Sequence, residues 1–309
     1  MTACCPGLTF GAMPKRTPTV RVNGRDKPMQ DRLEHVLDEL VQPTPGVQDL
    51  RSEAIVVEGL GKTYPDGTEA VRGVTIRVAA GECYGLLGPN GAGKSTTVGM
   101  LGTLIRPTSG RANVAGFDVV AQPQEVRRRI GFAMQEVGVD AFATARELLV
   151  LQGRLHGLRR AESGRRAELL LAMVDLTETA DKRLSEFSGG MQRRVDLAAS
   201  LIHLPPVVFL DEPTEGLDPR ARAAIWDALD RLRQHLGVTV LLTTHYMEEA
   251  DRLCDRLGII DRGSVVVEGT PAALKASIGS DSLQDVYLRY TGHAFGPNEG
   301  ALIAMEQAA

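Results

Sequence analysis

Residues 88–96 read Gly88-Pro89-Asn90-Gly91-Ala92-Gly93-Lys94-Ser95-Thr96 and match the spacing GxxxxGK[ST]. An apolar run that begins at Cys83 and ends at Leu87, predicted to be a buried strand, precedes this loop, and a stretch predicted to be helical follows it through Leu104. Glycines allow successive backbone N–H groups to turn toward one anion, and the start of the following helix adds its positive end. The stretch therefore predicts a phosphate-binding loop between a strand and a helix.

Three side chains of this loop have separate expected roles. Lys94 would reach the β- and γ-phosphates of a nucleoside triphosphate, Ser95 would offer its hydroxyl to Mg²⁺, and Thr96 would contact the inner phosphates. The alternative is a glycine turn that only caps a helix. Because an accidental match in a chain of this composition has an expectation of roughly one per cent, we favour the phosphate-binding interpretation.

From residue 54 onward the sequence alternates between strand-like and helix-like segments, a pattern typical of a mostly parallel sheet flanked by helices. With 309 residues, 43% of them hydrophobic, the chain can bury a large core. Helical patterns alone fill residues 143–176, which indicates a helical insert. Besides the run before the loop, the predicted strands are residues 54–57, 74–78, 207–210, 238–242 and 258–260.

Composition excludes several classes of protein. A net charge of −4 supplies no basic field for a nucleic-acid backbone, and we interpret Arg127-Arg128-Arg129 as a solvated helix face. Four cysteines are too few for a disulfide framework, which fits a reducing cytoplasm. No apolar run is long enough to span a bilayer, and the N-terminus does not have the order of a secretory signal. We expect a protein that stays inside the cell and binds no nucleic acid.

Residues 1–50 differ from the rest because six prolines are spread through polar and basic residues. We expect an N-terminal extension that is largely unstructured, with one helix over residues 29–41. A gene start placed too early, with the true start at Met13 or Met29, is an open alternative. A lipid on Cys4 or Cys5 is a weaker one, since no myristoylation-type start accompanies them.

A second glycine turn lies at Ser188-Gly189-Gly190, before a predicted helix that runs through Ile202. The serine hydroxyl and the glycine N–H groups make another helix start that can bind an anion, so one chain carries two half-sites for phosphate. A plain helix cap is the alternative for this turn taken alone.

Two carboxylates, Asp211 and Glu212, directly follow the buried-strand run at residues 207–210. The carboxyl ends of strands are where α/β sheets bind ligands. Asp211 is placed to hold Mg²⁺, usually through water, and Glu212 can polarise the water that attacks a γ-phosphate. A solvated acidic turn is the alternative.

Together these motifs resemble the ATPase subunit of an ATP-binding cassette transporter over about residues 54–269. Ser188-Gly189-Gly190 is similar to the core of the family's signature motif, Asp211 and Glu212 to its acidic strand end, and Gly216-Leu217-Asp218-Pro219 to its D-loop. Phe187 and Met191 depart from the usual leucine and glutamine of the signature, but the serine and glycines are intact.

The resemblance implies roles for further residues. Gln135 stands where the family's Q-loop glutamine contacts Mg²⁺ and couples the site to the membrane subunit, His245 at the switch histidine, and Tyr64 at the aromatic residue that stacks on adenine. The implied site therefore comprises catalytic Glu212, His245, Gln135 and Lys94; nucleotide-binding Tyr64, Gly88, Pro89, Asn90, Gly91, Ala92, Gly93, Lys94, Ser95 and Thr96; a signature of Ser188, Gly189, Gly190 and Gln192 that acts on the ATP of a second copy; Asp218 in the D-loop; and Ser95, Gln135 and Asp211 at Mg²⁺.

The resemblance also implies an architecture: an α/β P-loop NTPase with a mostly parallel sheet core, an antiparallel β subdomain and a helical subdomain. The expected divisions are the extension at 1–50, the ATPase domain at 51–279 with its helical subdomain at about 136–188, and a short C-terminal helix and tail at 280–309. The implied assembly is a homodimer joined through ATP. It drives a separate transmembrane permease and is peripheral to the cytoplasmic face of the cell membrane.

Three phrases place the resemblance in the multidrug and antibiotic-resistance exporter branch: Tyr84-Gly85-Leu86-Leu87, Glu212-Pro213-Thr214-Glu215 and Thr244-His245-Tyr246-Met247. The cargo stays open among drug, antibiotic, lipid and polysaccharide, because the permease decides it. The alternative function is a soluble cassette ATPase that acts on DNA or ribosomes. A regulatory protein that does not hydrolyse ATP is disfavoured because Glu212 is present.

Overall fold

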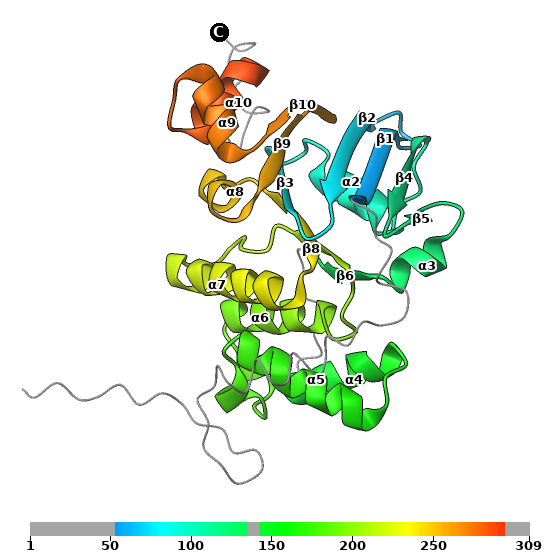
Figure 1. Cartoon of the computed structure of the whole chain (residues 1–309), viewed down its shortest axis with the longest axis vertical. Helices are drawn as coiled ribbons and strands as arrows, with labels where there is room; N and C mark the ends of the chain where they lie inside the picture. The colour runs from blue at the N-terminus through cyan, green and yellow to red at the C-terminus, as the bar shows by residue number, and fades with distance from the viewer. Residues whose placement is uncertain (1–52, 135–141, 294–309) are drawn as a thin grey trace, which may run out of the picture. The chain divides into compact units, whose positions relative to one another are not determined.

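The computed structural model describes residues 53–134 and 142–293. The N-terminal extension with its predicted helix, the predicted Q-loop residue Gln135 and residues 294–309 lie outside the described residues. In the described residues the strands form two sheets, one of six strands and one of four (Figure 1).

The six-stranded sheet has the order β10-β9-β3-β8-β7-β6. Its pairs are parallel except β9 with β10, which run antiparallel. Every residue of the three central strands β3, β8 and β7 is buried, as expected for parallel strands covered on both faces. The strands span β3 Cys83–Leu87, β6 Ile130–Ala133, β7 Val207–Asp211, β8 Thr239–Thr244, β9 Arg256–Asp261 and β10 Ser264–Gly269.

The four-stranded sheet is antiparallel, in the order β2-β1-β4-β5. Strands β1 and β2 alternate between buried and less buried residues, the pattern of a sheet with one face on the core. The bounds are β1 Glu53–Thr63, β2 Glu69–Ala79, β4 Ser109–Val114 and β5 Phe117–Asp118.

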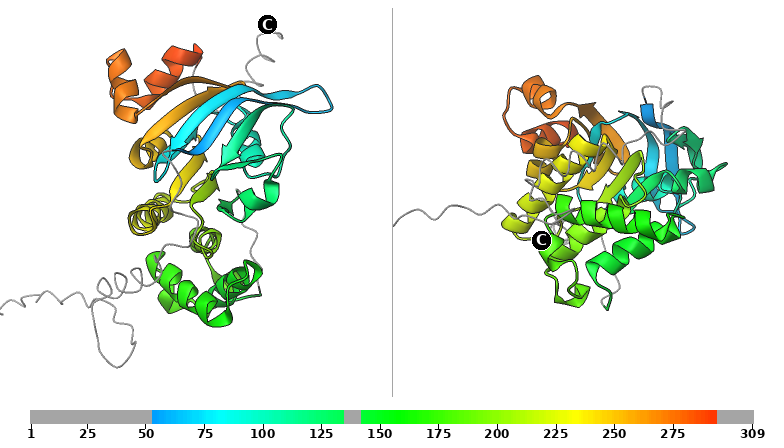
Figure 2. Two further views of the ribbon diagram at one scale, coloured as in Figure 1. Left: turned by 45° about the vertical axis from the view of Figure 1, so that its right-hand side comes forward. Right: turned by 60° about the horizontal axis from the view of Figure 1, so that its bottom comes forward.

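Helix α2, Lys94–Leu101, links the two sheets because it contacts strands of both. Helices α4 (Ala145–Leu155) and α5 (Arg160–Met173) pack on each other and on α6 (Gly189–Ser200) as a helical layer (Figure 2). The remaining helices are α3 Pro123–Arg127, α7 Pro219–Leu236, α8 Met247–Leu253, α9 Pro271–Ile278 and α10 Leu283–Thr291, with short 3₁₀ turns at Thr177–Thr179 and Leu184–Glu186.

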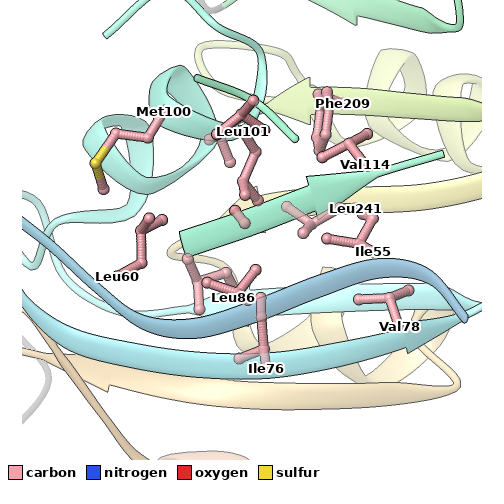
Figure 3. Packing of buried hydrophobic residues seen from close by; sticks show 14 of the residues in the cluster. Ile55, Leu60, Ile76, Val78, Leu86, Met100, Leu101, Val114, Phe209 and Leu241 are labelled. Carbon is pink, nitrogen blue, oxygen red and sulfur yellow. The ribbon is translucent and has the colours of Figure 1, made fainter. Parts of the chain in front are cut away.

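The main hydrophobic cluster joins the two sheets and α2. Figure 3 shows side chains from the antiparallel sheet, from α2 and from the parallel strands pointing toward one another. Burying each large side chain of this kind contributes about 1.5–3 kcal/mol. Members with no more than 1% exposure include Ile55, Leu60, Ile76, Leu86, Met100, Leu101 and Leu241.

The structure confirms the predicted α/β class with its mostly parallel core, and it corrects several boundaries. The helix after the loop ends at Leu101 instead of Leu104, because the next residues, Gly102 and the left-handed Thr103, leave helical geometry. The helix after the second glycine turn ends at Ser200 instead of Ile202. Strands β4, β5, β6 and β10 were not predicted.

A candidate nucleotide site at three strand ends

Three loops meet at the carboxyl ends of adjacent strands. Strand β8 is hydrogen-bonded to both β3 and β7, with Leu87 opposite Thr244 and Asp211 opposite Thr243. The phosphate-binding loop, Glu212 and His245 directly follow these strands. The sheet register therefore brings together three motifs that lie far apart in the sequence.

Glycine is required at two positions of the phosphate-binding loop. Gly93 has a φ of +100°, and a Cβ there would lie 2.5 Å from the carbonyl oxygen of Ala70. A Cβ on Gly88 would lie 2.3 Å from the carbonyl oxygen of Ile260. Since an L side chain fits neither position, the loop can approach its neighbours only with glycine.

Lys94, at the start of α2, is almost fully buried, with 4% exposure. Its ammonium donates to the carbonyl oxygens of Gly88 at 2.8 Å and Pro89 at 3.0 Å. It also forms an ion pair with Glu212 Oε1 at 3.0 Å. A buried cation is thus held inside the loop, next to the carboxylate that follows β7.

Glu212 has an unusual backbone, and both of its carboxylate oxygens have side-chain partners. Its φ of +50° is left-handed, a costly conformation for a residue other than glycine. Its second carboxylate oxygen, Oε2, lies 3.1 Å from His245 Nδ1. Burial by itself would raise the pKa of Glu212, but the positive charge and hydrogen bond of Lys94, with smaller contributions from Glu215 and His245, lower it. The carboxylate is therefore ionised at neutral pH.

The Asp211 carboxylate accepts hydrogen bonds from two hydroxyl groups. Its Oδ1 accepts hydrogen bonds from Ser95 Oγ at 3.1 Å and Thr243 Oγ1 at 2.5 Å. Hydroxyl and carboxylate oxygens are the donors that Mg²⁺ prefers, so these residues fit that ion. No group of three or more His, Cys, Asp or Glu side chains suited to a metal occurs in the described residues. Mg²⁺ here would therefore depend on phosphate and water oxygens as well.

A cavity of about 350 Å³ lies over the loop. Tyr64 is near it, with its hydroxyl 3.5 Å from Thr96 Oγ1 and the Lys62 ammonium 5.2 Å from its ring centroid. The lining residues are Ala70, Asn90, Gly91, Gly93, Lys94, Ser95, Thr96 and Glu212.

The second glycine turn does not line this cavity. Ser188 is exposed and caps α6, accepting a hydrogen bond from the backbone N–H of Met191 at 3.3 Å. The Gln192 amide donates to the Leu184 carbonyl at 3.0 Å, and Asp218 caps α7 through the N–H groups of Arg220 and Ala221. Ser188, Gly189 and Asp218 are exposed.

Two residues at the site were missed by sequence reasoning. Thr243 donates to Asp211, and its backbone carbonyl accepts the N–H of Glu212 at 3.1 Å. Arg193 is buried under the acidic strand end and donates to the carbonyl oxygens of Asp211 and Pro213. Thr243 could have been suspected because it directly follows the strand predicted at residues 238–242, whereas nothing in the sequence singled out Arg193.

Comparison with known proteins identifies the family. A model described as ABC transporter matches residues 71–215. The daunorubicin/doxorubicin resistance ATP-binding protein DrrA of Streptomyces peucetius is 50% identical over 233 residues, which cover 75% of this chain and 70% of that protein. The chain belongs to the ABC transporter family.

Two further members extend the comparison. The Nod factor export ATP-binding protein I of Paraburkholderia xenovorans (strain LB400) is 43% identical over 81% of this chain and 79% of its own length. A dimeric structure of the ATP-binding cassette MJ0796, in a post-hydrolysis state with ADP and Pi, has a TM-score of 0.64 at 28% identity, covering 70% of this chain and 98% of that one. The descriptions of these relatives favour the ATP-binding subunit of an exporter over the alternative of a soluble cassette ATPase that acts on DNA or ribosomes.

None of the helices in the described ranges combines the length and apolar character needed to cross a bilayer. Within the described residues of this ABC transporter chain, Lys94, Ser95, Asp211, Glu212 and His245 lie together at the strand ends.

Proposed function

We propose that this chain is the ATP-hydrolysing subunit of an ABC exporter. It works as a homodimer that is joined through ATP and drives a separate membrane permease from the cytoplasmic face of the membrane. One observation carries the proposal. A buried lysine and a histidine both contact one buried, ionised glutamate beside a cavity over a glycine-rich loop.

Lys94 binds the β- and γ-phosphates of ATP, and Thr96 and the loop N–H groups bind the inner phosphates. Because a γ-phosphate competes with Glu212 for the Lys94 ammonium, ATP frees the carboxylate. Glu212 then accepts a proton from the water that attacks the γ-phosphorus, and ADP leaves with the bridging oxygen. His245, in contact with Glu212, stabilises charge on the transferred phosphoryl group.

Ser95 and Asp211 would hold Mg²⁺, and the ion would neutralise charge on the phosphates. Gln135 is proposed as a further ligand from the sequence alone. Tyr64 stacks on the adenine, a role supported by its hydrogen bond to Thr96 beside the loop.

The signature residues complete the site of a second copy. Ser188 and Gly189 are exposed at the start of α6 and do not line their own chain's cavity, which supports a role across a dimer interface. Gln192 and Asp218 are proposed to contribute at the same interface. A ligand that bridges two subunits favours the closed dimer, and loss of the γ-phosphate removes that bias. The dimeric ATP-binding cassette with ADP and Pi supports this arrangement.

Export is supported by the relatives, which are described as resistance proteins for daunorubicin and doxorubicin or as Nod factor exporters. We infer export of a drug, antibiotic, lipid or polysaccharide, the cargo being chosen by the permease. Affinity purification of the chain from detergent-solubilised membranes tests this assembly. Recovery of a polytopic membrane protein is expected, whereas recovery of ribosomes in its place would contradict it.

Lys94→Ala tests the nucleotide site directly. We expect a loss of about 10- to 100-fold in ATP affinity, equivalent to a charge-assisted hydrogen bond of about 1.5–3 kcal/mol, together with a loss of hydrolysis. Titration with a fluorescent ATP analogue measures the affinity. Lys275→Ala is the matched control, because this lysine pairs with Asp251 at 2.8 Å and lines no part of the cavity. Unchanged ATP binding by Lys94→Ala would refute the site.

A further inference from the structure

The guanidinium of Arg193 is enclosed beneath the acidic strand end. Arg193 lies on α6 and is only 5% exposed. Its Nε donates to the Pro213 carbonyl at 2.9 Å, and its Nη2 donates to the carbonyls of Asp211 at 2.8 Å and Glu212 at 3.3 Å. Its Nη1 donates to the Met134 carbonyl at the end of β6. One side chain thus binds four main-chain oxygens from two loops.

Three of these oxygens belong to consecutive residues, and the left-handed Glu212 is the middle one. Consecutive carbonyls in an extended strand point to opposite sides and cannot share one donor group. The turn at Glu212 brings them to the same side, where the planar guanidinium matches them. Arg193 therefore binds the same backbone turn that points the Glu212 carboxylate toward Lys94 and His245.

A buried cation is costly unless it is compensated, so Arg193 is not a neutral packing residue. Burial lowers the pKa of Arg193, and the carboxylate of Asp196, 3.6 Å away on the same helix, opposes that effect. Carbonyl oxygens of the strand end also face the guanidinium. Removing the guanidinium would leave these oxygens without that donor, and the loop would be free to relax.

We propose that Arg193 is a positioning residue for hydrolysis, holding Glu212 of its own chain in the left-handed conformation and tying it to helix α6, which Ser188 caps. The proposal rests on the proposed function, in which Glu212 accepts the proton of the attacking water. Arg193 acts in cis, although the start of α6 serves the nucleotide bound by the second copy.

Arg193→Lys keeps the charge but not the planar fork that reaches several carbonyls. We expect kcat for ATP hydrolysis to fall about 100-fold, as a misplaced catalytic group does, with KM and ATP affinity unchanged. The ATP-bound dimer should accumulate, because binding persists while hydrolysis is slow. Arg193→Met removes the positive charge as well as the planar group. If Arg193→Met does not fold, the kcat of Arg193→Lys alone tests whether Arg193 positions Glu212.

Arg194→Lys is the matched control. Arg194 is the next residue of α6 and donates to the Val174 carbonyl at 2.8 Å, away from the acidic strand end. Its kcat should stay within about twofold of wild type. A kcat for Arg193→Lys that also stays within about twofold would overturn the proposal, as would a fall that Arg194→Lys reproduces.

Mixed dimers separate a cis role from a role in the signature. One subunit carries Lys94→Ala, so the working site uses the loop and Glu212 of the other subunit. Arg193→Lys on the subunit with the working loop should lower hydrolysis by the same factor of about 100, whereas on the Lys94→Ala subunit it should leave the rate of the mixed dimer unchanged. The reverse pattern would overturn the proposal. If the mixed dimer without any Arg193 change is inactive, or Lys94→Ala homodimers are fully active, the proposed function itself fails.

Discussion

Several oxygen atoms of the pocket share the ammonium group of Lys94. The ammonium of Lys94 contacts two loop carbonyls and Glu212, and Glu212 is shared between Lys94 and His245. A strong acceptor such as a γ-phosphate would therefore rearrange several contacts at once. For this reason the proposed mechanism gives phosphate binding to Lys94 and proton transfer to its neighbour Glu212.

Glu212→Gln should separate these two steps. The amide keeps the shape of the side chain but accepts no proton, so hydrolysis should fall by about 10²- to 10⁴-fold while ATP still binds. Light scattering should detect an ATP-loaded dimer that persists. Glu248→Gln, an exposed carboxylate on α8, is the control and should hydrolyse ATP normally. Rapid turnover by Glu212→Gln would refute its role as the base.

Asp196 makes the stability of the fold depend on pH. Burial raises its pKa to about 6, although nearby Arg193 opposes the shift, and Oδ2 has no hydrogen-bond partner. The unfolded chain releases this proton near pH 4, whereas the folded chain keeps it until about pH 6. The free energy of unfolding should therefore fall as the pH rises through this window.

Asp196→Asn mimics the protonated carboxyl. We expect it to raise the free energy of unfolding by about 1–3 kcal/mol at pH 8 and to change it little at pH 4. Urea unfolding at the two pH values measures the difference. Asp281→Asn, at an exposed position, should show no such pH dependence. An equal effect of Asp196→Asn at both pH values would contradict this account.

Short sequence motifs predicted the residues that line the pocket, but they did not predict the buried residue Arg193, which holds the pocket's backbone in place. Lys94, Ser95, Asp211 and Glu212 lie in short motifs with fixed spacing, and the structure brings them together. Arg193 had no such signal, because its contacts reach residues about 20 and 59 positions away along the chain. Arg193 binds four main-chain carbonyl groups, and because every residue has such a group, the sequence does not reveal these contacts.

At the scale of elements, burial decides which strands could be predicted. The fully buried β3, β7 and β8 each contain a short apolar run that marks them as buried strands. Strand β4 buries only two of its six residues, so its sequence lacks a strand signal. In β6, Gly131 lowers the strand propensity but is required, because a Cβ would lie 2.2 Å from the Ser200 carbonyl oxygen.

Helix α4 provides a test of stability that is separate from catalysis. Thr144 and Glu147 form a capping box, with hydrogen bonds of 3.1 and 2.9 Å between each side chain and the other residue's backbone N–H. Thr144→Ala should lower the free energy of unfolding by about 1 kcal/mol, and Thr144→Ser should restore it. Urea unfolding measures this, while the ATPase rate per folded molecule should not change. A lower rate in the folded Thr144→Ala protein would contradict the separation.

At the scale of the whole molecule, the phosphate-binding loop lines the cavity and the second glycine turn does not, which fits the proposal that they are half-sites completed by two copies. A mixed dimer of Lys94→Ala and Ser188→Arg subunits should therefore regain hydrolysis, because one composite site is intact. Each homodimer should be inactive. Two affinity tags isolate the mixed dimer for the ATPase assay. Complete inactivity of that dimer would argue against sharing between subunits.

The position of β8 has a consequence for biosynthesis. Strand β8 lies between β3 and β7 in the sheet but follows both in the chain. When residues up to about 236 have emerged from the ribosome, the phosphate-binding loop and the acidic strand end are already outside, but strand β8, which joins them, is not. Nascent chains should thus hold these two parts apart until β8 inserts, and pocket assembly becomes a late event in synthesis.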